Sequence, residues 1–422
     1  MANEDQQENK RRPAWTSKAL TILRKWVLLP LVGALISVML IGRVVDWVIG
    51  PKAYKVYVVG NFEGADATQN PNPSTADSIW AGISGQGSLS DINGVPIKFE
   101  KWDDAGDPVD AQRISADLAT RNDSLLVVGH FASTQTKAAL PAYLRIATPP
   151  IPVILTTETN PALLPPRSRA TGYDPLFRLS PTDEGQAVTA ATFAIAHGAR
   201  GFWVVETVSN PVYSQFLTRK FSEQALARSS RVVLWTNNLS VPPVQTIQTL
   251  NVDWVFFAGG WQDALILVRQ IRAMPGGHNV NVILSDAAVD LRLIQQGSDA
   301  VKDVYVTHPM LAETYEGKAG YGMYGYEAFQ LTQQLVDKAN ANFGQIASRT
   351  GGFGYWFRRF LGLRRATDAR NVMAAVMQDA VLQGIPFRLN GGICRFRPET
   401  ATCEGASFHV WQVQNGTFKT VQ

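Results

Sequence analysis

The sequence predicts an α/β fold with parallel sheets, preceded by an apolar N-terminal segment. After residue 55, apolar runs typical of buried strands alternate with stretches of helical spacing over roughly 200 residues. The strand-like runs are apolar throughout, as parallel strands covered on both faces are. The chain has 422 residues, well beyond the ~150 of a common single domain. Two α/β domains are therefore predicted beyond the N-terminal segment.

The N-terminal segment has the properties of a membrane anchor. Residues 26–41 carry no charge, and apolar residues continue to Ile49 around Arg43 and Asp46. A helix of residues 26–49 would be ~36 Å long, more than the ~30 Å hydrocarbon core of a bilayer. Six Lys or Arg precede the stretch and few follow it, which predicts a cytoplasmic tail at 1–25 and a body outside the cell membrane. A cleaved signal peptide and a buried core helix are the alternatives, although no A-x-A-like cleavage site follows.

The elements of the body follow in order. Val56–Gly60 (VYVVG) is the first buried run, and the alternating stretch Pro96–Trp102 is the second strand. The other expected strands are 124–129, 152–155, 201–205, 232–235, 254–258 and 280–284, and the expected helices are 109–120, 136–146, 186–197, 214–227 and 263–274. Ligands of open parallel sheets bind beyond the carboxyl ends of the strands, so the strand-to-helix loops are where a site is expected.

Composition and motifs argue against several classes of function. The net charge is +4, but residues 1–25 carry +3 and residues 349–370 carry +5, which leaves a mildly acidic body without the basic face that nucleic acid requires. The five histidines lie far apart, and there are only two cysteines. Gly320, Gly322 and Gly325 match G-x-G-x-x-G but follow no strand. We therefore expect no catalytic residue, no cofactor and no metal site.

Several strand-end segments resemble one family. Val127–Ala139 (VVGHFASTQTKAA) and Ile151–Leu163 (IPVILTTETNPAL) are similar to the leucine/isoleucine/valine-binding proteins of branched-chain amino-acid transport, in the type I periplasmic binding-protein family. Trp102–Pro108, Phe177–Ala187 and the C-terminal FHVWQVQNGTF match the same family in the same order. The resemblance implies two α/β lobes joined by three crossovers. Lobe one would be 54–178 and 308–388, and lobe two 179–307 and 389–422.

The resemblance also implies a set of ligand-binding residues. Ser133 and Thr134 match the family's carboxylate-binding loop at the start of a helix, where the helix dipole favours an anion. Thr159 matches a threonine that contacts the amino and carboxylate groups of the ligand. Asp286 matches the acidic partner of the ligand ammonium. Each of these residues has an alternative role, as a helix cap or as a turn residue.

Three further positions complete the expected site. Tyr213 and Trp261 match aromatic positions of lobe two, where they would be either walls of the ligand site or ordinary packing. Glu158 departs from the family, which has a small residue there. If Glu158 faces the cleft, it would repel a ligand carboxylate or fill the side-chain pocket, or it would instead recruit a cationic group. This departure puts branched-chain amino acids in doubt as the ligand.

Two features lie outside the family pattern. Residues 349–366 (RTGGFGYWFRRFLGLRRA) form a basic, aromatic insertion in lobe one. It is expected to be a second membrane contact, a docking site for a partner, or a helical hairpin packed on lobe one. Cys394 and Cys403 flank a predicted turn, and a disulfide between them is expected outside the cytoplasm.

The resemblance implies a function that is not enzymatic. The expectation is a membrane-tethered extracytoplasmic protein that captures a small polar ligand, such as an amino acid, between its lobes. Delivery to the permease of an ABC transporter is the leading use. The alternative is a tethered sensing module that signals to a membrane partner, which a permanent anchor would suit.

Overall fold

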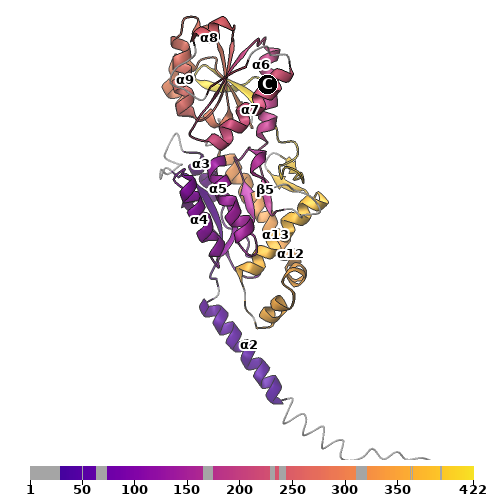
Figure 1. The fold of residues 1–422 in the computed structure, drawn as a ribbon. Helices are drawn as coiled ribbons and strands as arrows, with labels where there is room; N and C mark the ends of the chain where they lie inside the picture. The colour runs from indigo at the N-terminus through magenta and orange to yellow at the C-terminus, as the bar shows by residue number, and fades with distance from the viewer. Residues whose placement is uncertain are drawn as a thin grey trace, which may run out of the picture.

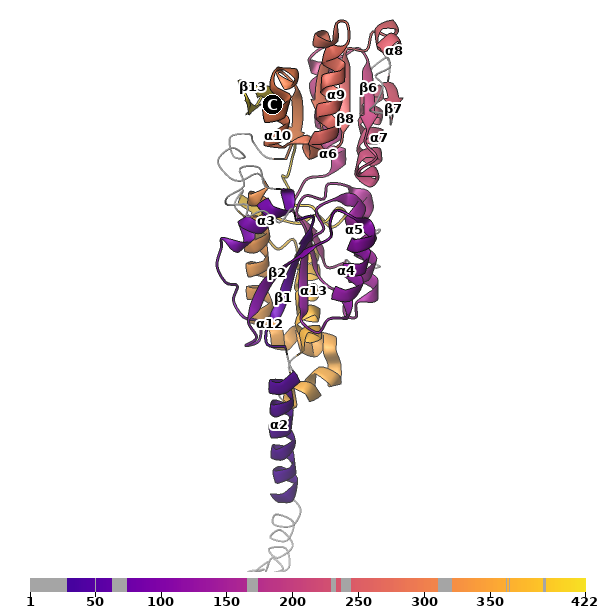
Figure 2. The same ribbon diagram turned by 90° about the vertical axis from the view of Figure 1, so that its left-hand side faces the viewer.

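The computed structural model describes residues 29–49, 51–62, 74–164, 174–228, 233–236, 244–309, 321–361, 363, 365–389 and 392–422. The predicted cytoplasmic tail, residues 1–25, and the first residues of the predicted anchor lie outside these ranges. Two lobes follow one another along the length of the molecule, and a single helix extends from the far end of the first lobe (Figures 1 and 2). The predicted α/β architecture with two lobes is confirmed.

Lobe one is built on a five-stranded sheet in the order β2-β1-β3-β4-β5. Every neighbouring pair is parallel. The strands are β1 (Tyr54–Gly60), β2 (Ile97–Asp103), β3 (Ser124–Gly129), β4 (Val153–Leu155) and β5 (Leu176–Arg178). All the side chains of β3 are buried, because helices cover both faces of the sheet. The continuous apolar run in the sequence is the consequence of this double burial.

The alternation of side chains along β1 divides the core of lobe one into two layers. Val56 and Val58 pack among residues of three helices on one face, whereas Tyr57 and Val59 pack on the other face. The helices of the first face are α3 (Thr75–Ser84), α12 (Gly322–Phe360) and α13 (Ala366–Gln383). Those of the second face are α4 (Pro108–Thr120) and α5 (Ser133–Pro141), which continues as a π-helical turn to Ile146. Two of these helices, α12 and α13, therefore follow the first ten strands in the sequence and return the chain from lobe two to lobe one.

Lobe two contains a seven-stranded sheet in the order β14-β13-β10-β9-β8-β6-β7. The five strands from β7 to β10 are parallel, and β13 and β14 add an antiparallel edge. These strands are β6 (Phe202–Glu206), β7 (Val233–Thr236), β8 (Trp254–Ala258), β9 (Asn281–Leu284), β10 (Tyr305–His308), β13 (His409–Gln414) and β14 (Thr417–Thr420). The helices are α6 (Asp183–Ala196), α7 (Pro211–Ala227), α8 (Val244–Thr249), α9 (Trp261–Ala273) and α10 (Leu291–Gly297).

The chain stays in lobe one longer than the sequence suggested. A small hairpin of β11 (Phe387–Leu389) and β12 (Gly392–Cys394) leads into residues that still pack on lobe one. Phe396 stacks on Phe177 of β5 with ring centroids 3.9 Å apart, and the backbone amide of Arg178 donates to the carbonyl of Ala401. The expected return to lobe two at residue 389 therefore falls within a segment held to lobe one by this aromatic and backbone contact.

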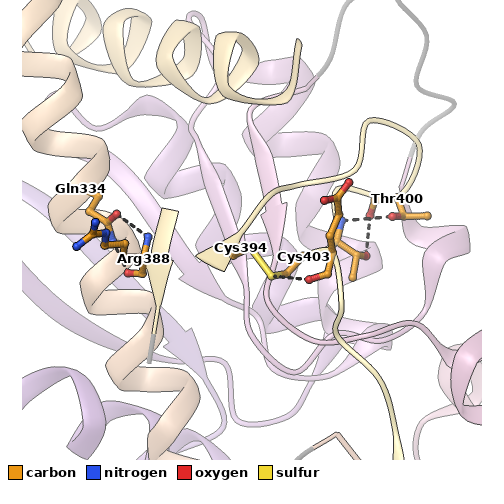
Figure 3. Close-up of a disulfide and its surroundings, with 7 residues drawn as sticks. Gln334, Arg388, Cys394, Thr400 and Cys403 are labelled. Atoms are coloured by element: carbon orange, nitrogen blue, oxygen red, sulfur yellow. Dashed lines mark hydrogen bonds between the residues drawn. A yellow bond between two sulfur atoms is a disulfide. The ribbon is translucent and has the colours of Figure 1, made fainter. Parts of the chain in front are cut away.

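Cys394 and Cys403 are joined by a disulfide that closes the loop between β12 and the crossing into lobe two (Figure 3). The pairing agrees with the expectation from the sequence. Next to it, the side-chain amide of Gln334 on α12 exchanges two hydrogen bonds with the backbone of Arg388 on β11. The hairpin is thus held to α12 at β11 and to the segment that follows it at β12.

The N-terminal helix α2 (Leu29–Ile49) extends beyond the end of lobe one that lies away from lobe two (Figure 2). Side chains are described for residues 31–41, and all of them except Met39 are exposed. Within the described residues, no helix is both long and apolar enough to cross a membrane.

Candidate functional site

A cavity of about 290 Å³ lies between the two lobes, and residues of both lobes line it. From lobe one come the loops that follow β1, β2, β3 and β4, which contribute Asn61, Asp104, Ser133 and Glu158. From lobe two come the loops that follow β6, β8 and β9. They contribute Tyr213, Trp261 and Asp286. Parallel strands bring all these carboxyl ends to one edge of each sheet, and the two edges face each other.

Ser133 is the first residue of α5, and its side chain is almost completely buried at the cavity. Ala132 stands at the N-cap position and offers no side-chain oxygen to the first-turn amides. The positive end of the helix dipole and the Ser133 hydroxyl therefore meet at the cavity wall, an arrangement that stabilises an anion. Ser133 therefore lies at the cavity as expected, and its role in binding a carboxylate stays a prediction.

Thr134 is placed differently from the expectation. It does not line the cavity; its hydroxyl instead donates a hydrogen bond to Oδ1 of Asn210 at 2.8 Å, and its amide approaches the same atom at 3.3 Å. Consecutive helical residues point about 100° apart, so the residue after Ser133 faces lobe two rather than the cavity. Asn210 precedes α7. Thr134 therefore connects the two lobes.

The loop after β4 is anchored to the first crossover. The carbonyl of Glu158 accepts a hydrogen bond from Ser180, and the carbonyl of Thr159 accepts one from the amide of Asp183. The guanidinium of Arg178, fully buried at the end of β5, donates to the carbonyl of Asn160 at 2.8 Å. Glu158 and Thr159, both at the cavity wall, are thus held where the chain leaves lobe one for lobe two.

The electrostatic state of Glu158 differs from that of an exposed carboxylate. Burial raises its pKa to about 8, and the nearby Asp104 acts in the same direction, although the hydroxyls of Ser133 and Thr136 and the charge of Arg178 oppose the shift. Neither carboxyl oxygen makes a hydrogen bond of good geometry with a described residue. At neutral pH the group is therefore largely protonated. The repulsion of a ligand carboxylate, expected for an ionised Glu158, is correspondingly weak.

Asp286 opens a short 3₁₀ turn after β9 and supplies an acidic group from lobe two. Its Oδ1 accepts hydrogen bonds from the Tyr213 hydroxyl at 2.6 Å and from the Gln186 side-chain amide at 2.8 Å. Burial raises the pKa of Asp286, and the hydrogen bonds from Tyr213 and Gln186 oppose this shift. The Tyr321 hydroxyl donates to the Asp286 backbone carbonyl. The carboxyl is thus fixed in place at the cavity.

The aromatic wall includes more than the expected residues. Trp261 begins α9, and the guanidinium of Arg292 lies 4.9 Å from its ring centre. Arg292 is paired with Asp290 at 2.7 Å. The contact between the Arg292 guanidinium and the Trp261 ring holds the indole in one orientation. Tyr321 also lines the cavity, from the segment that leads into α12.

Sequence reasoning missed several polar lining residues: Asn61, Asp104, Gln135, Asn210, Arg292 and Tyr321. Asp104 and Asn61 directly follow β2 and β1, so their position after a strand was an available signal. Tyr321 does not follow a strand-like run in the sequence, so no such signal pointed to it. Among the described residues, no group of three or more His, Cys, Asp or Glu side chains is arranged to hold a metal ion.

Two α/β lobes with a cavity between their strand ends define a class of two-lobed binding folds. The chain belongs to the periplasmic binding protein family, whose sequence model matches residues 74–378. A Leu/Ile/Val-binding protein of Escherichia coli is 24% identical over 262 residues, which cover 60% of this chain and 67% of that protein. The similarity to such proteins that was expected from the sequence is therefore confirmed.

Related proteins extend the comparison. An amino acid binding protein of Pseudomonas aeruginosa is 27% identical over 312 residues, which cover 68% of this chain and 78% of that protein. The crystal structure of a leucine binding protein from Thermotoga maritima superimposes with a TM-score of 0.65 at 18% identity, covering 88% of this chain and 98% of that one. A solute binding protein from R. palustris in complex with 4-hydroxybenzoate gives 0.64 at 17% identity, covering 88% and 96%. The two structural matches show a shared fold.

Proposed function

We propose that this protein captures a small carboxylate ligand, with an amino acid as the leading candidate, in the cavity between its lobes and delivers it to an ABC transporter permease. One observation carries the proposal. The start of α5 with Ser133 and the side chain of Asp286 lie on different lobes, and both line the same cavity. An amino acid carries an anionic and a cationic group, which match these two positions.

The ligand class follows from the chemistry of the two positions. Leucine and 4-hydroxybenzoate, named for two proteins of similar fold, share a carboxylate but not an ammonium group. The helix start at Ser133 suits either ligand. Asp286 favours the amino acid because a buried carboxylate gains a strong charge-assisted bond from an ammonium group. The cavity volume of about 290 Å³ limits the ligand to a small molecule.

A ligand screen tests this proposal. The full chain, purified in detergent, is heated in the presence of single amino acids or 4-hydroxybenzoate, and the unfolding temperature of the body is measured. A true ligand at 100 times its Kd adds about 2.7 kcal/mol of stability. A shift with an amino acid supports the proposal. A shift with 4-hydroxybenzoate alone would assign an aromatic acid, and no shift with any carboxylate would reject the carboxylate site.

We also propose that residues 26–49 tether the protein to the cell membrane, with the N-terminus in the cytoplasm and the body outside. The charge-free stretch, the cationic residues before it and the exposed apolar side chains of α2 support this arrangement. A reporter that is active only in the cytoplasm, fused after Gln422, should be silent. Strong reporter activity would reverse the topology.

The tether also favours a second candidate function, because a sensing module gains from staying at the membrane. In that case the captured ligand would change a contact with a membrane partner rather than be transported. Uptake of the ligand found in the screen separates the two functions. A strain without this protein should lose uptake under the transport proposal and keep it under the sensing proposal.

A further inference from the structure

The last turns of α12 form a separate arm. The helix is interrupted at Gly352, whose φ of 52° and ψ of −144° are not helical. Glycine adopts this conformation without the steric cost that a side chain would bring. We call the residues beyond this break, 353–360, the aromatic arm.

One face of the aromatic arm presents large aromatic side chains to the surroundings. Phe353, Trp356 and Phe357 are 76%, 58% and 47% exposed, and Phe360 is half-buried beside them. Their spacing places them on one side of a helix. Phe353 stacks against Trp356 and Phe357, and Trp356 stacks against Phe360, with ring centroids 5.7–6.2 Å apart. An exposed cluster of this kind is rare on a protein surface that meets only water.

The opposite face fixes the aromatic arm to lobe one. Tyr355 is buried in the lobe one core, near Phe343. Arg358 pairs with Asp368 at the start of α13, and the guanidinium of Arg359 donates to the Tyr355 hydroxyl at 3.3 Å. The aromatic face is therefore presented by a packed element. The packing on lobe one that the sequence offered as one alternative is found on the buried face, and the exposed face is free of this packing.

The aromatic arm lies beside the N-terminal helix. Ile36, Met39 and Leu40 of α2 line one cavity of about 790 Å³ together with Trp356 and Phe360 of the arm. In Figure 1, α2 leaves the body at the same end as the tip of α12. The exposed apolar residues of α2 are Leu31, Val32, Leu35, Ile36, Val38, Leu40 and Ile41. At 100° per residue they point to all sides of the helix, which a bilayer covers and a single protein face does not.

We propose that the aromatic arm inserts into the outer leaflet of the membrane beside α2. This inference depends on the proposed tether. Met39 and Leu40 lie beyond the middle of residues 26–49, on the side from which the body emerges, so the arm that lines the cavity with them is on the outer-leaflet side of the bilayer. In the outer leaflet, tryptophan and phenylalanine rings are favoured toward the boundary between headgroups and acyl chains. With two points of contact, the body would hold one orientation on the membrane instead of turning about α2.

A fluorescent probe on the intact chain tests the insertion. Both native cysteines are in the disulfide, so the variant Phe357→Cys carries a single reactive thiol for the dye NBD. Leu226→Cys near the end of α7, in lobe two, is the matched control, because Leu226 is similarly exposed at 57%. Each labelled chain is reconstituted into vesicles of phosphatidylcholine and phosphatidylglycerol, with or without a lipid that carries a doxyl quencher in its acyl chain.

At position 357 we expect the NBD emission to shift to shorter wavelength in the vesicles and to lose intensity when the doxyl lipid is present. At position 226 we expect neither change. A probe at 357 that behaves like the control, in chains that float with the vesicles, would overturn the inference and leave the tether intact. A blue shift at 357 without quenching would also overturn it, because the aromatic face would then contact protein. Chains that do not float would reject the tether itself.

Discussion

Glu158 directly precedes Thr159 in the loop after β4, and only 1% of its surface is exposed. The resemblance to the family implied a small residue at this position, and the acidic residue put branched-chain amino acids in doubt as the ligand. Its protonation depends on burial, on Arg178 from β5 and on Asp104 from the loop after β2. These groups meet only in the folded lobe, so the neutral state of Glu158 could not be predicted from its own sequence neighbourhood.

The raised pKa of Glu158 gives a prediction for pH. The ordinary value of 4.5 rises to about 8 in the folded protein, so between these values the folded state holds a proton that the unfolded state has lost. The stability contributed by this group is therefore fully present below pH 4.5 and is lost as pH rises toward 8. One pKa unit corresponds to about 1.4 kcal/mol.

The variant Glu158→Gln keeps the size of the side chain and removes its titration. We expect the wild type to lose several degrees of unfolding temperature relative to this variant between pH 5 and pH 8, measured in the same detergent. The comparison cancels the contributions of other buried acids, such as Asp183 and Asp286. A difference between the two proteins that stays constant over this range would show that Glu158 titrates normally.

For single residues, the family resemblance correctly predicted which side chains would lie at the cavity in most cases. Ser133, Glu158, Thr159, Tyr213, Trp261 and Asp286 all line the cavity. Thr134 does not, because its direction on α5 is set by the helix geometry and by its partner Asn210 on lobe two. Whether any of these residues contacts a ligand stays a prediction.

At the scale of elements, the buried parallel strands were the easiest to predict. β1, β3 and β8 are covered on both faces, and their sequences are almost wholly apolar. β5 has three residues and too short a pattern to be recognised. The segment from β12 to Cys403 belongs to lobe one because Phe396 stacks on Phe177, a contact between residues more than 200 positions apart that local patterns do not show.

The insertion shows another limit at this scale. Its apolar and basic residues were visible in the sequence, but they fitted a packed hairpin, a membrane contact and a docking site for a partner alike. The break at Gly352 turns the arm so that Tyr355 enters the core while Phe353 and Trp356 remain outside. The side on which each ring lies depends on this backbone geometry.

At the scale of the whole molecule, the site requires both lobes. Thr134 of α5 and Asn210 before α7 are hydrogen-bonded to each other, and the Asn160 side chain donates to the carbonyl of Val212. The lobes are therefore in contact around the cavity. The alternation of strands and helices predicted two α/β units, but the arrangement of their strand ends around one cavity came from the family resemblance rather than from periodicity.

The most direct test of the binding proposal uses Asp286, because its carboxyl would pair with the ligand ammonium from the lobe opposite Ser133. Asp286→Asn keeps the acceptor for Tyr213 and Gln186 and removes the charge. Titration calorimetry with the amino acid found in the screen should show a loss of about 2–5 kcal/mol relative to the wild type, the cost of removing one member of a buried charge pair. Equal affinity in the variant and the wild type, with both proteins folded, would contradict capture of an amino acid between the lobes.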